Sequence, residues 1–241
     1  MSPPILHLRD IHITFGGTPL LTGAELAVEE GARICLVGRN GSGKSTLLKV
    51  AAGLLDPDGG EGFRQPRTTI AFLPQEPDFS GYATAYDYVA AGFAEGHDPH
   101  PGRVILEALG LTGEEDPATF SGGEARRCAL ARVLGPEPDI LLLDEHTAAL
   151  DPKSAAKIAE LTSKIVRENR LTTLMVTHSM HQAAEMPDRI VMMHHGKIAE
   201  DFSGINKQRV RIPDLMDAFD RVTKREYLDE SAAAMLKQQY I

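Results

Sequence analysis

The chain has 241 residues, of which 42% are hydrophobic, and this is enough for one large domain or for a core with an added subdomain. Its formal net charge of −9 argues against a nucleic-acid-binding platform, which needs a basic face, so no direct DNA binding is expected. No apolar run approaches the roughly 20 residues of a membrane-spanning helix, and the first residues lack the pattern of a signal peptide. The two cysteines, Cys35 and Cys128, lie in apolar segments and are expected to be core residues rather than ligands or a disulfide. We therefore expect a cytoplasmic protein.

The first thirty residues predict strands. Residues 5–15 alternate between apolar and polar side chains, which indicates one or two half-buried strands with a bend near Asp10. A turn is expected at 16–19, and the alternation at 25–29 indicates a strand that pairs antiparallel with the first. Phe15 is either a core residue of the first strand or a stacking partner for a base.

A glycine-rich loop lies between a predicted strand and a predicted helix. The short apolar run 34–37 is typical of a buried parallel strand, and 47–52 predicts a helix that ends at Gly53. The loop, GRNGSGKST at 38–46, matches the phosphate-binding pattern G-x-x-x-x-G-K-[ST] in the context that this pattern requires. Its glycines allow backbone N–H groups to surround a phosphate, its lysine can reach the β- and γ-phosphates, and the next serine can hold Mg²⁺. The nucleotide-binding residues expected here are Gly38, Asn40, Gly41, Ser42, Gly43, Lys44, Ser45 and Thr46.

The middle of the chain predicts a small helical subdomain at about 78–135, inserted into the core. Before it, residues 53–68 are rich in turn-forming residues and a buried strand is expected at 70–73. Gln75 follows that strand and can reach toward a metal site, although alone it is an ordinary loop glutamine.

Within this subdomain, Thr84 with Asp87 resembles a capping box at a helix start. Residues 93–102 predict a loop, and a short helix is expected at 104–109, closed by Gly110.

A second helix start with glycines follows at Ser121, Gly122 and Gly123, before a helix at 125–134. Ser121 is a good N-cap, and the first turn of this helix is a second candidate anion site. Taken alone, the string SGGE is most often only a capped helix start.

Three later segments predict buried strands, at 140–143, 172–176 and 189–193. Polar side chains follow the first two, and ligands bind at the carboxyl ends of strands in open α/β sheets. Asp144 can orient Mg²⁺, and Glu145 can polarise an attacking water. His178 can hydrogen-bond a γ-phosphate or that water. The alternatives are a solvated pair of carboxylates at a helix start and a capping or core histidine.

The C-terminal part predicts few further functional groups. His194 and His195 are adjacent in a strand and should point to opposite faces, so joint metal ligation is not expected. Residues 203–211 resemble a linker, and two tail helices are expected at 213–222 and 226–238.

Together these motifs resemble an ABC-type ATPase domain over about residues 4–201. The resemblance implies an α/β fold: a P-loop NTPase (RecA-like) core with an N-terminal antiparallel β subdomain and an inserted α-helical subdomain. We expect the ATPase domain at 1–204 and a helical tail at 205–241. ATP and Mg²⁺ are the implied ligands, and ATP hydrolysis is the implied reaction. The family also implies a head-to-tail dimer, with ATP between the glycine-rich loop of one copy and the SGGE signature of the other.

The resemblance assigns a role to each motif. Phe15 matches the base-stacking position, the loop at 38–45 matches Walker A, and Ser121, Gly122 and Gly123 match the signature that contacts ATP. Ser45, Gln75 and Asp144 are the implied metal-binding residues. Glu145 and His178 are the implied catalytic residues, and 149–151 matches the D-loop.

The two parts of the chain resemble different branches of the family. Residues 1–143 resemble the first ATPase domain of ABC-F proteins, which are soluble and ribosome- or translation-associated, through the strings HITFGGTPLL at 12–21, LPQEP at 73–77 and LGLT at 109–112. Residues 144–241 resemble the ATPase subunit of a bacterial importer-type transporter, through EHTAALDPK at 145–153, VTHSM at 176–180 and MMHHGKI at 192–198. This pattern predicts a mosaic, natural or engineered, joined near 144.

Three functions follow from this resemblance. The favoured one is an ATPase that powers a transporter through separate membrane permease subunits, as a dimer with itself or a related subunit, and peripheral on the inner face of the plasma membrane. The second is a soluble ABC-F-like ATPase; the ribosome is the less favoured partner, because 75 to 121 leaves no room for a long arm. The third is an engineered chimera without a physiological partner.

Overall fold

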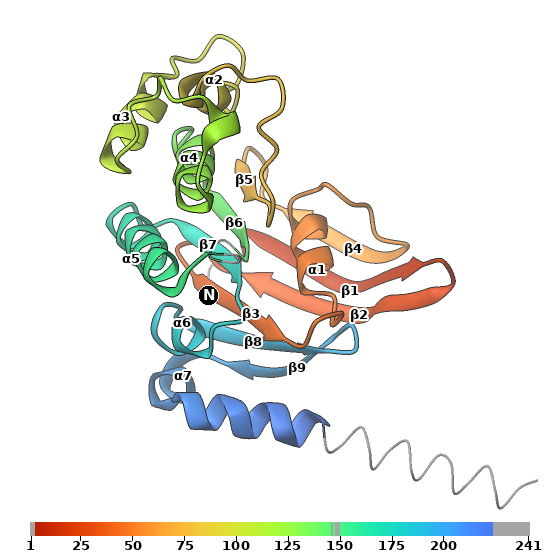
Figure 1. The fold of residues 1–241 in the computed structure, drawn as a ribbon. Coiled ribbons are helices and arrows are strands. Elements are labelled where there is room, and N and C mark those ends of the chain that lie inside the picture. The colour runs from red at the N-terminus through yellow and green to blue at the C-terminus, as the bar shows by residue number, and fades with distance from the viewer. Residues whose placement is uncertain (1–2, 146, 148–149, 224–241) are drawn as a thin grey trace, which may run out of the picture.

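The computed structural model describes residues 3–145, 147 and 150–223, whose strands form two sheets (Figure 1). The smaller sheet has the strand order β2-β1-β4, and the larger has the order β5-β6-β7-β3-β8-β9. The strands are β1 Leu6–Phe15, β2 Thr18–Val28, β3 Arg33–Gly38, β4 Gly59–Arg64, β5 Ile70–Leu73, β6 Ile140–Asp144, β7 Thr172–Val176, β8 Arg189–His194 and β9 Lys197–Phe202. The helices are α1 Lys44–Ala51, α2 Ala85–Ala90, α3 His100–Ala108, η1 Pro117–Thr119, α4 Gly122–Leu134, α5 Pro152–Glu168, α6 Met180–Glu185 and α7 Gly204–Arg209.

The smaller sheet confirms the predicted antiparallel pair and adds a third strand. β1 pairs with β2, and the ladder shifts register around Asp10, whose positive φ of 51° produces the predicted bend. The segment 53–68 was predicted as turns, and this is wrong, because it contains β4. Five of the six β4 residues are exposed, so no apolar alternation marks the strand in the sequence. Pairing with β1, which places Leu6 opposite Arg64, creates it.

The larger sheet contains the five predicted buried strands and, in addition, β9. β5, β6, β7, β3 and β8 run parallel to their neighbours, and β9 pairs antiparallel with β8 at one edge. Every residue of β6 and β7 is buried, as expected for strands covered on both faces. Because the strands are parallel, the segments that follow β3, β5, β6 and β7 leave the sheet at the same edge.

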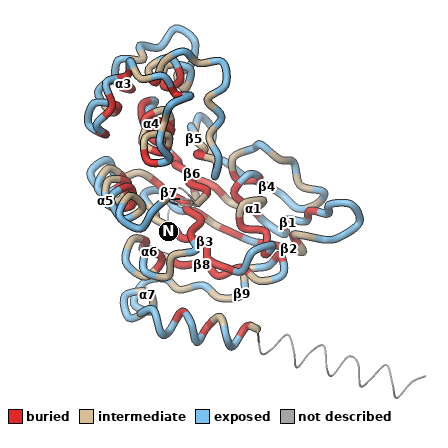
Figure 2. Tube along the Cα trace, in the orientation of Figure 1, coloured by how far each residue is buried: buried red, intermediate tan, exposed pale blue. Residues whose placement is uncertain are grey.

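Two hydrophobic clusters cover opposite faces of the larger sheet. Cys35 and Val37 of β3 belong to one cluster, and Ile34 and Leu36 belong to the other, because successive side chains of a strand point to opposite faces. Figure 2 places the buried residues along the strands and on the inner sides of the helices. Cys35 and Cys128 are buried and not disulfide-bonded, and burial raises the pKa of each thiol to about 12, so both are core residues as predicted.

The helices α2, α3 and α4 form a group at the top of Figure 1, away from the smaller sheet. The predicted capping box of Thr84 and Asp87 is present at the start of α2. α3 begins at His100, inside the segment predicted as a loop, because Pro99 and Pro101 are compatible with the entry and first turn of a helix. Gly110 follows the helix end with a positive φ of 79°, as predicted.

The segment 203–211 was predicted as a linker, and this is wrong, because it contains α7. None of the α7 residues is buried, so no apolar stripe identifies the helix. Lys207 nevertheless fixes it, donating from Nζ to the Ala184 carbonyl oxygen at 2.6 Å. A helix follows at 212–223 and buries Leu215 and Ala218, while the predicted helix at 226–238 lies outside the described residues. No helix within the described ranges is long and apolar enough to cross a membrane.

Candidate nucleotide-binding and hydrolysis site

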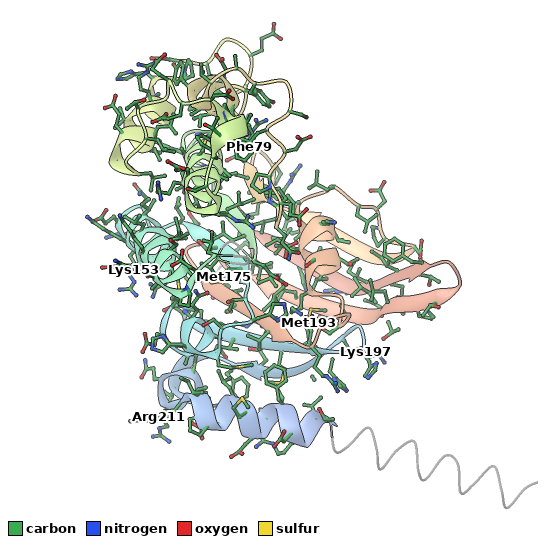
Figure 3. All side chains as sticks on the ribbon, viewed as in Figure 1. Phe79, Lys153, Met175, Met193, Lys197 and Arg211 are labelled. Atoms are coloured by element: carbon green, nitrogen blue, oxygen red, sulfur yellow. The ribbon has the colours of Figure 1, made fainter. Side chains whose placement is uncertain are left out.

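The glycine-rich loop connects β3 to α1, and its backbone requires glycine. Gly41 and Gly43 have positive φ angles of 80° and 94°. A Cβ on Gly43 would collide with the Leu21 side chain, and one on Gly38 would collide with the carbonyl oxygen of Met193, a residue labelled in Figure 3. One side of the loop therefore packs closely against Leu21 and Met193. Its N–H groups and the start of α1 can face a bound anion on the other.

Lys44 begins α1 and is only 5% exposed. Its Nζ donates hydrogen bonds to the carbonyl oxygens of Gly38 at 2.9 Å and Arg39 at 3.0 Å. Burial lowers the pKa of the Lys44 ammonium, while the nearby carboxylates of Glu145 and Asp144 favour its charged form. The Ser42 hydroxyl, in the same loop, is buried without a hydrogen-bond partner. The loop thus contains a desolvated cation and a polar atom that a phosphate ligand could satisfy.

Ser45 and Asp144 form a pair of hard oxygen donors at the bottom of the site. The Ser45 hydroxyl donates to Asp144 Oδ1 at 2.8 Å, and Asp144 is only 3% exposed. Burial raises the pKa of the Asp144 carboxyl, and the Ser45 hydrogen bond opposes that shift. A hydroxyl beside a buried carboxylate suits Mg²⁺, which binds oxygen ligands and favours a deprotonated carboxylate.

The Glu145 side chain contacts Gln75 and His178, which follow the ends of β5 and β7. Its Oε1 lies 2.6 Å from His178 Nε2, and its Oε2 accepts a hydrogen bond from Gln75 Nε2 at 3.3 Å. Glu145 has a positive φ of 47°, and its N–H donates to the Val176 carbonyl oxygen on β7. This turn directs the side chain between the segments that follow β5 and β7. The Glu145 side chain is 14% exposed and that of His178 is 44% exposed, so the pair remains open to solvent on the histidine side.

A cleft of about 300 Å³ brings most of the predicted residues together. Its lining consists of Leu20, Asn40, Gly41, Gly43, Lys44, Ser45, Thr46, Gln75, Glu145 and His178. Leu20 was not predicted, because a leucine in a strand carries no signal for a ligand. Phe15 is 53% exposed at the end of β1 and is not among the lining residues, so the structure leaves its side chain accessible without placing it in the cleft.

The signature residues lie elsewhere in the same chain. Ser121, Gly122 and Gly123 are not among the residues that line the cleft. They form the predicted helix start, where the Ser121 hydroxyl and N–H both donate to Glu124 Oε2, at 2.6 and 2.9 Å. The neighbours of the two glycines include Leu150 and Ser154, near the start of α5. Residue 149 of the predicted D-loop is outside the described residues.

Arg126 on α4 was not predicted as a functional residue, and it is only 6% exposed. Its guanidinium donates to the carbonyl oxygen of Pro74 at 3.0 Å and to that of Gln75. The available signal was an arginine inside an Ala- and Leu-rich helix, where a charge has to find partners.

The expected geometry of His194 and His195 is wrong. Their ring centroids are 4.3 Å apart and the rings are nearly perpendicular, because His195 has left the strand with a positive φ of 44°. Within the described residues, no group of three or more His, Cys, Asp or Glu side chains could hold a metal ion.

The family model described as ABC transporter matches residues 21–148. The aliphatic sulfonates import ATP-binding protein SsuB of Granulibacter bethesdensis is 36% identical over 200 residues, which cover 82% of this chain and 83% of that protein. The chain belongs to the ABC transporter family. It is therefore an ABC ATPase, with ATP as its substrate, and its α/β core is the P-loop NTPase fold predicted from the motifs.

Other comparisons agree with this family. The ATP-binding protein Uup of Caulobacter vibrioides is 36% identical over 231 residues, which cover 92% of this chain but only 37% of that protein. Two solved structures of the cassette MJ0796 match the fold: a dimeric form, with TM-score 0.73 and 26% identity, and a dimeric post-hydrolysis state bound to ADP and Pi, with TM-score 0.72 and 25% identity. Each covers 81% of this ABC ATPase and 97% of the solved chain.

The comparisons do not support the predicted mosaic. The matches to Uup and to SsuB cover 92% and 82% of the chain, so each alignment crosses residue 144. Uup and SsuB therefore each align with one continuous stretch of this chain rather than with one half of it.

Proposed function

We propose that this ABC ATPase powers a membrane transporter, with separate permease subunits as its partners and a peripheral position on the inner face of the plasma membrane. The support is the SsuB relative, which is named for import and aligns over more than four fifths of both chains. The observation that carries a hydrolytic role is the contact of Glu145 with both Gln75 and His178 at the rim of the cleft. Three strand ends supply one polar cluster directly beside the glycine-rich loop.

Within this proposal, the loop residues and Lys44 bind the phosphates of ATP. Ser45, Asp144 and Gln75 are the residues that would hold Mg²⁺, which neutralises phosphate charge during phosphoryl transfer. Glu145 accepts the proton of the attacking water. His178 orients Glu145 and lies where it can hydrogen-bond the transferring phosphoryl group. Phe15, exposed at the end of β1, stacks on the base.

We further propose that the working form is an ATP-dependent head-to-tail dimer of this chain with itself or a related subunit. The signature lies away from the chain's own cleft, so it can contact a nucleotide only in another copy. Ser121, Gly122 and Gly123 form a capped helix start, whose N–H groups can face a phosphate bound in the cleft of the other copy. The dimeric solved cassettes with 25% and 26% identity support the same assembly.

The domain division that we propose rests on contacts between helices and on the burial of residues in the tail. We assign the ATPase domain to 1–204, its helical subdomain to about 78–135, and the helical tail to 205–241. The helices α2, α3 and α4 support the subdomain, since each pair of them is in contact. Leu215 and Ala218 support a tail that packs on the domain, since both are fully buried.

A soluble ABC-F-like ATPase is the second candidate. It is favoured by the strings at 12–21, 73–77 and 109–112, which resemble ABC-F proteins. The ATP-binding protein Uup aligns over 92% of this chain, but the chain spans only 37% of the length of Uup, so only ATP binding is carried over from that relative.

One experiment separates the two candidates. The tagged protein, carrying Glu145→Gln to retain ATP, is expressed together with the membrane proteins encoded beside it, and cell lysate is fractionated with and without ATP. Recovery with a permease in the membrane fraction supports the transporter. Sedimentation with ribosomes, and absence from membranes, would refute it in favour of the second candidate.

A further inference from the structure

Arg126 connects the signature helix to the segment that carries Gln75. Its guanidinium is almost fully buried, and its two NH groups donate to the carbonyl oxygens of Pro74 and Gln75. Both acceptors are backbone atoms, so this contact fixes the path of the chain directly after β5. Burial lowers the pKa of Arg126, and the carboxylates of Glu76, Asp144 and Glu145 oppose that shift by favouring the cation.

The Gln75 side chain continues the connection to the reacting groups. It donates from Nε2 to Glu145 Oε2 at 3.3 Å, a long hydrogen bond that a small movement of the backbone would break. Among the described residues, Arg126 donates hydrogen bonds to Pro74 and Gln75 and not to Glu145, so its hydrogen-bonded connection to Glu145 passes through Gln75. Its charge also interacts with the Glu145 carboxylate, and a lysine at this position would keep that charge.

The same segment has a second anchor farther along. Phe79, labelled in Figure 3, has its ring centroid 4.4 Å from that of Tyr88 and 5.5 Å from that of Phe120. Loss of the Arg126 contacts would therefore release the part of the segment near Gln75, while the aromatic cluster keeps the rest in place.

We propose that Arg126 is a positioning residue for ATP hydrolysis, which holds the backbone of Pro74 and Gln75 so that the Gln75 amide stays on Glu145. This inference rests on the proposed catalytic role of Glu145. The planar guanidinium fork reaches two carbonyl oxygens at once, whereas a lysine ammonium is a single point donor on a flexible stem. Arg126→Lys should therefore restore the charge without restoring the geometry.

Arg132 offers a matched control on the same helix. Its guanidinium also donates to a backbone oxygen, the Tyr88 carbonyl, at 2.9 Å, and to the Tyr82 hydroxyl at 3.2 Å. Its hydrogen bonds within the described residues go to Tyr82, Tyr88 and Ala91 and not to the backbone of Pro74 or Gln75. Arg132→Gln thus removes a similar set of structural contacts from α4 without touching the connection to Glu145.

The test compares kcat, KM for ATP and Tm of the purified full chain with those of Arg126→Gln, Arg126→Lys and Arg132→Gln. Both Gln variants are expected to lower Tm. Only the Arg126 variants should lower kcat, by about ten- to a hundredfold, the scale of a slightly misplaced catalytic group, with KM unchanged within about twofold. An equal loss of kcat in Arg132→Gln, or a normal kcat in Arg126→Gln, would overturn the proposal.

A double-mutant cycle with Gln75→Ala tests the path of the effect. Gln75→Ala keeps the backbone carbonyl that Arg126 binds, so the Tm loss caused by Arg126→Gln should persist in that background. The additional loss of kcat should disappear, because the side chain that transmits it is gone. The same fold loss of kcat in both backgrounds would contradict the inference and leave the proposed function intact. Absence of ATPase activity in the unsubstituted chain would overturn both.

Discussion

Glu145→Gln is the substitution that separates ATP binding from hydrolysis most cleanly in this structure. Glutamine has nearly the same size as glutamate, and its amide can accept from Gln75 through oxygen and donate to His178 Nε2 through nitrogen. Both contacts, at 3.3 and 2.6 Å, can therefore survive in altered form. What disappears is the negative charge and the ability to take a proton from water.

The expected loss of kcat is about 10²- to 10⁴-fold, the usual contribution of a general base. At about 1.4 kcal/mol for each tenfold change, this corresponds to roughly 3–6 kcal/mol of transition-state stabilisation. ATP should still bind and should persist. Because ATP would then hold the signature of a second copy, the dimer should accumulate with ATP and Mg²⁺.

The assay combines steady-state ATPase rates with light scattering after size exclusion, with and without ATP. Glu185→Gln is the matched control: Glu185 Oε1 also lies near a histidine, 3.4 Å from His181 Nε2, but on the surface of α6 and not among the residues lining the cleft. Its kcat should equal that of the unsubstituted chain. Ser121→Arg, added to Glu145→Gln, should abolish the dimer and spare ATP binding to the monomer.

Two results would refute this reasoning. Normal hydrolysis by Glu145→Gln would remove Glu145 from the role of base. A variant that retains ATP but stays monomeric at high protein concentration would refute the self-dimer and direct attention to a related subunit.

Three further predictions concern the same cleft. Lys44→Ala should lose most ATP affinity or turnover, since the phosphates would face backbone dipoles alone; wild-type hydrolysis by a folded Lys44→Ala protein contradicts the assignment. His178→Ala should keep ATP binding, measured by equilibrium titration, and lose kcat by roughly 10²-fold, whereas an unchanged kcat removes His178 from the reaction. Asp144→Asn should raise the Tm of the nucleotide-free protein at neutral pH. Burial raises the pKa of Asp144 in the folded state, so the folded state loses stability as the pH rises from the ordinary aspartate pKa through the raised one. The variant should lack that pH-dependent loss and also the extra stabilisation by ATP with Mg²⁺, and an unchanged pH profile of Tm would contradict the argument.

Several features of this protein could be predicted from sequence, because their signals are local. Short apolar runs bounded by glycine or polar residues marked the strands β3, β5, β6, β7 and β8, since strands buried on both faces need continuous apolar side chains. The glycine-rich loop was identified by residue type and spacing alone. The rule that parallel strands present their carboxyl ends at one edge was sufficient to expect Gln75, Glu145 and His178 near that loop.

Other features depend on contacts between residues far apart in the chain. β4 is almost entirely exposed and α7 buries none of its residues, so only pairing with β1 and the Lys207 contact with α6 produce them. His195 joins His194 because a turn replaces the strand at that residue. Packing between α4 and three strand ends decides how Glu145 is held: one of its oxygens contacts Gln75 and the other contacts His178. The same packing buries Arg126 against the backbone after β5. The groups available for ATP chemistry could be identified from the amino-acid sequence, because residue type and strand position are local properties. How those groups are held depends on the tertiary structure, because their hydrogen bonds join elements that are distant in sequence.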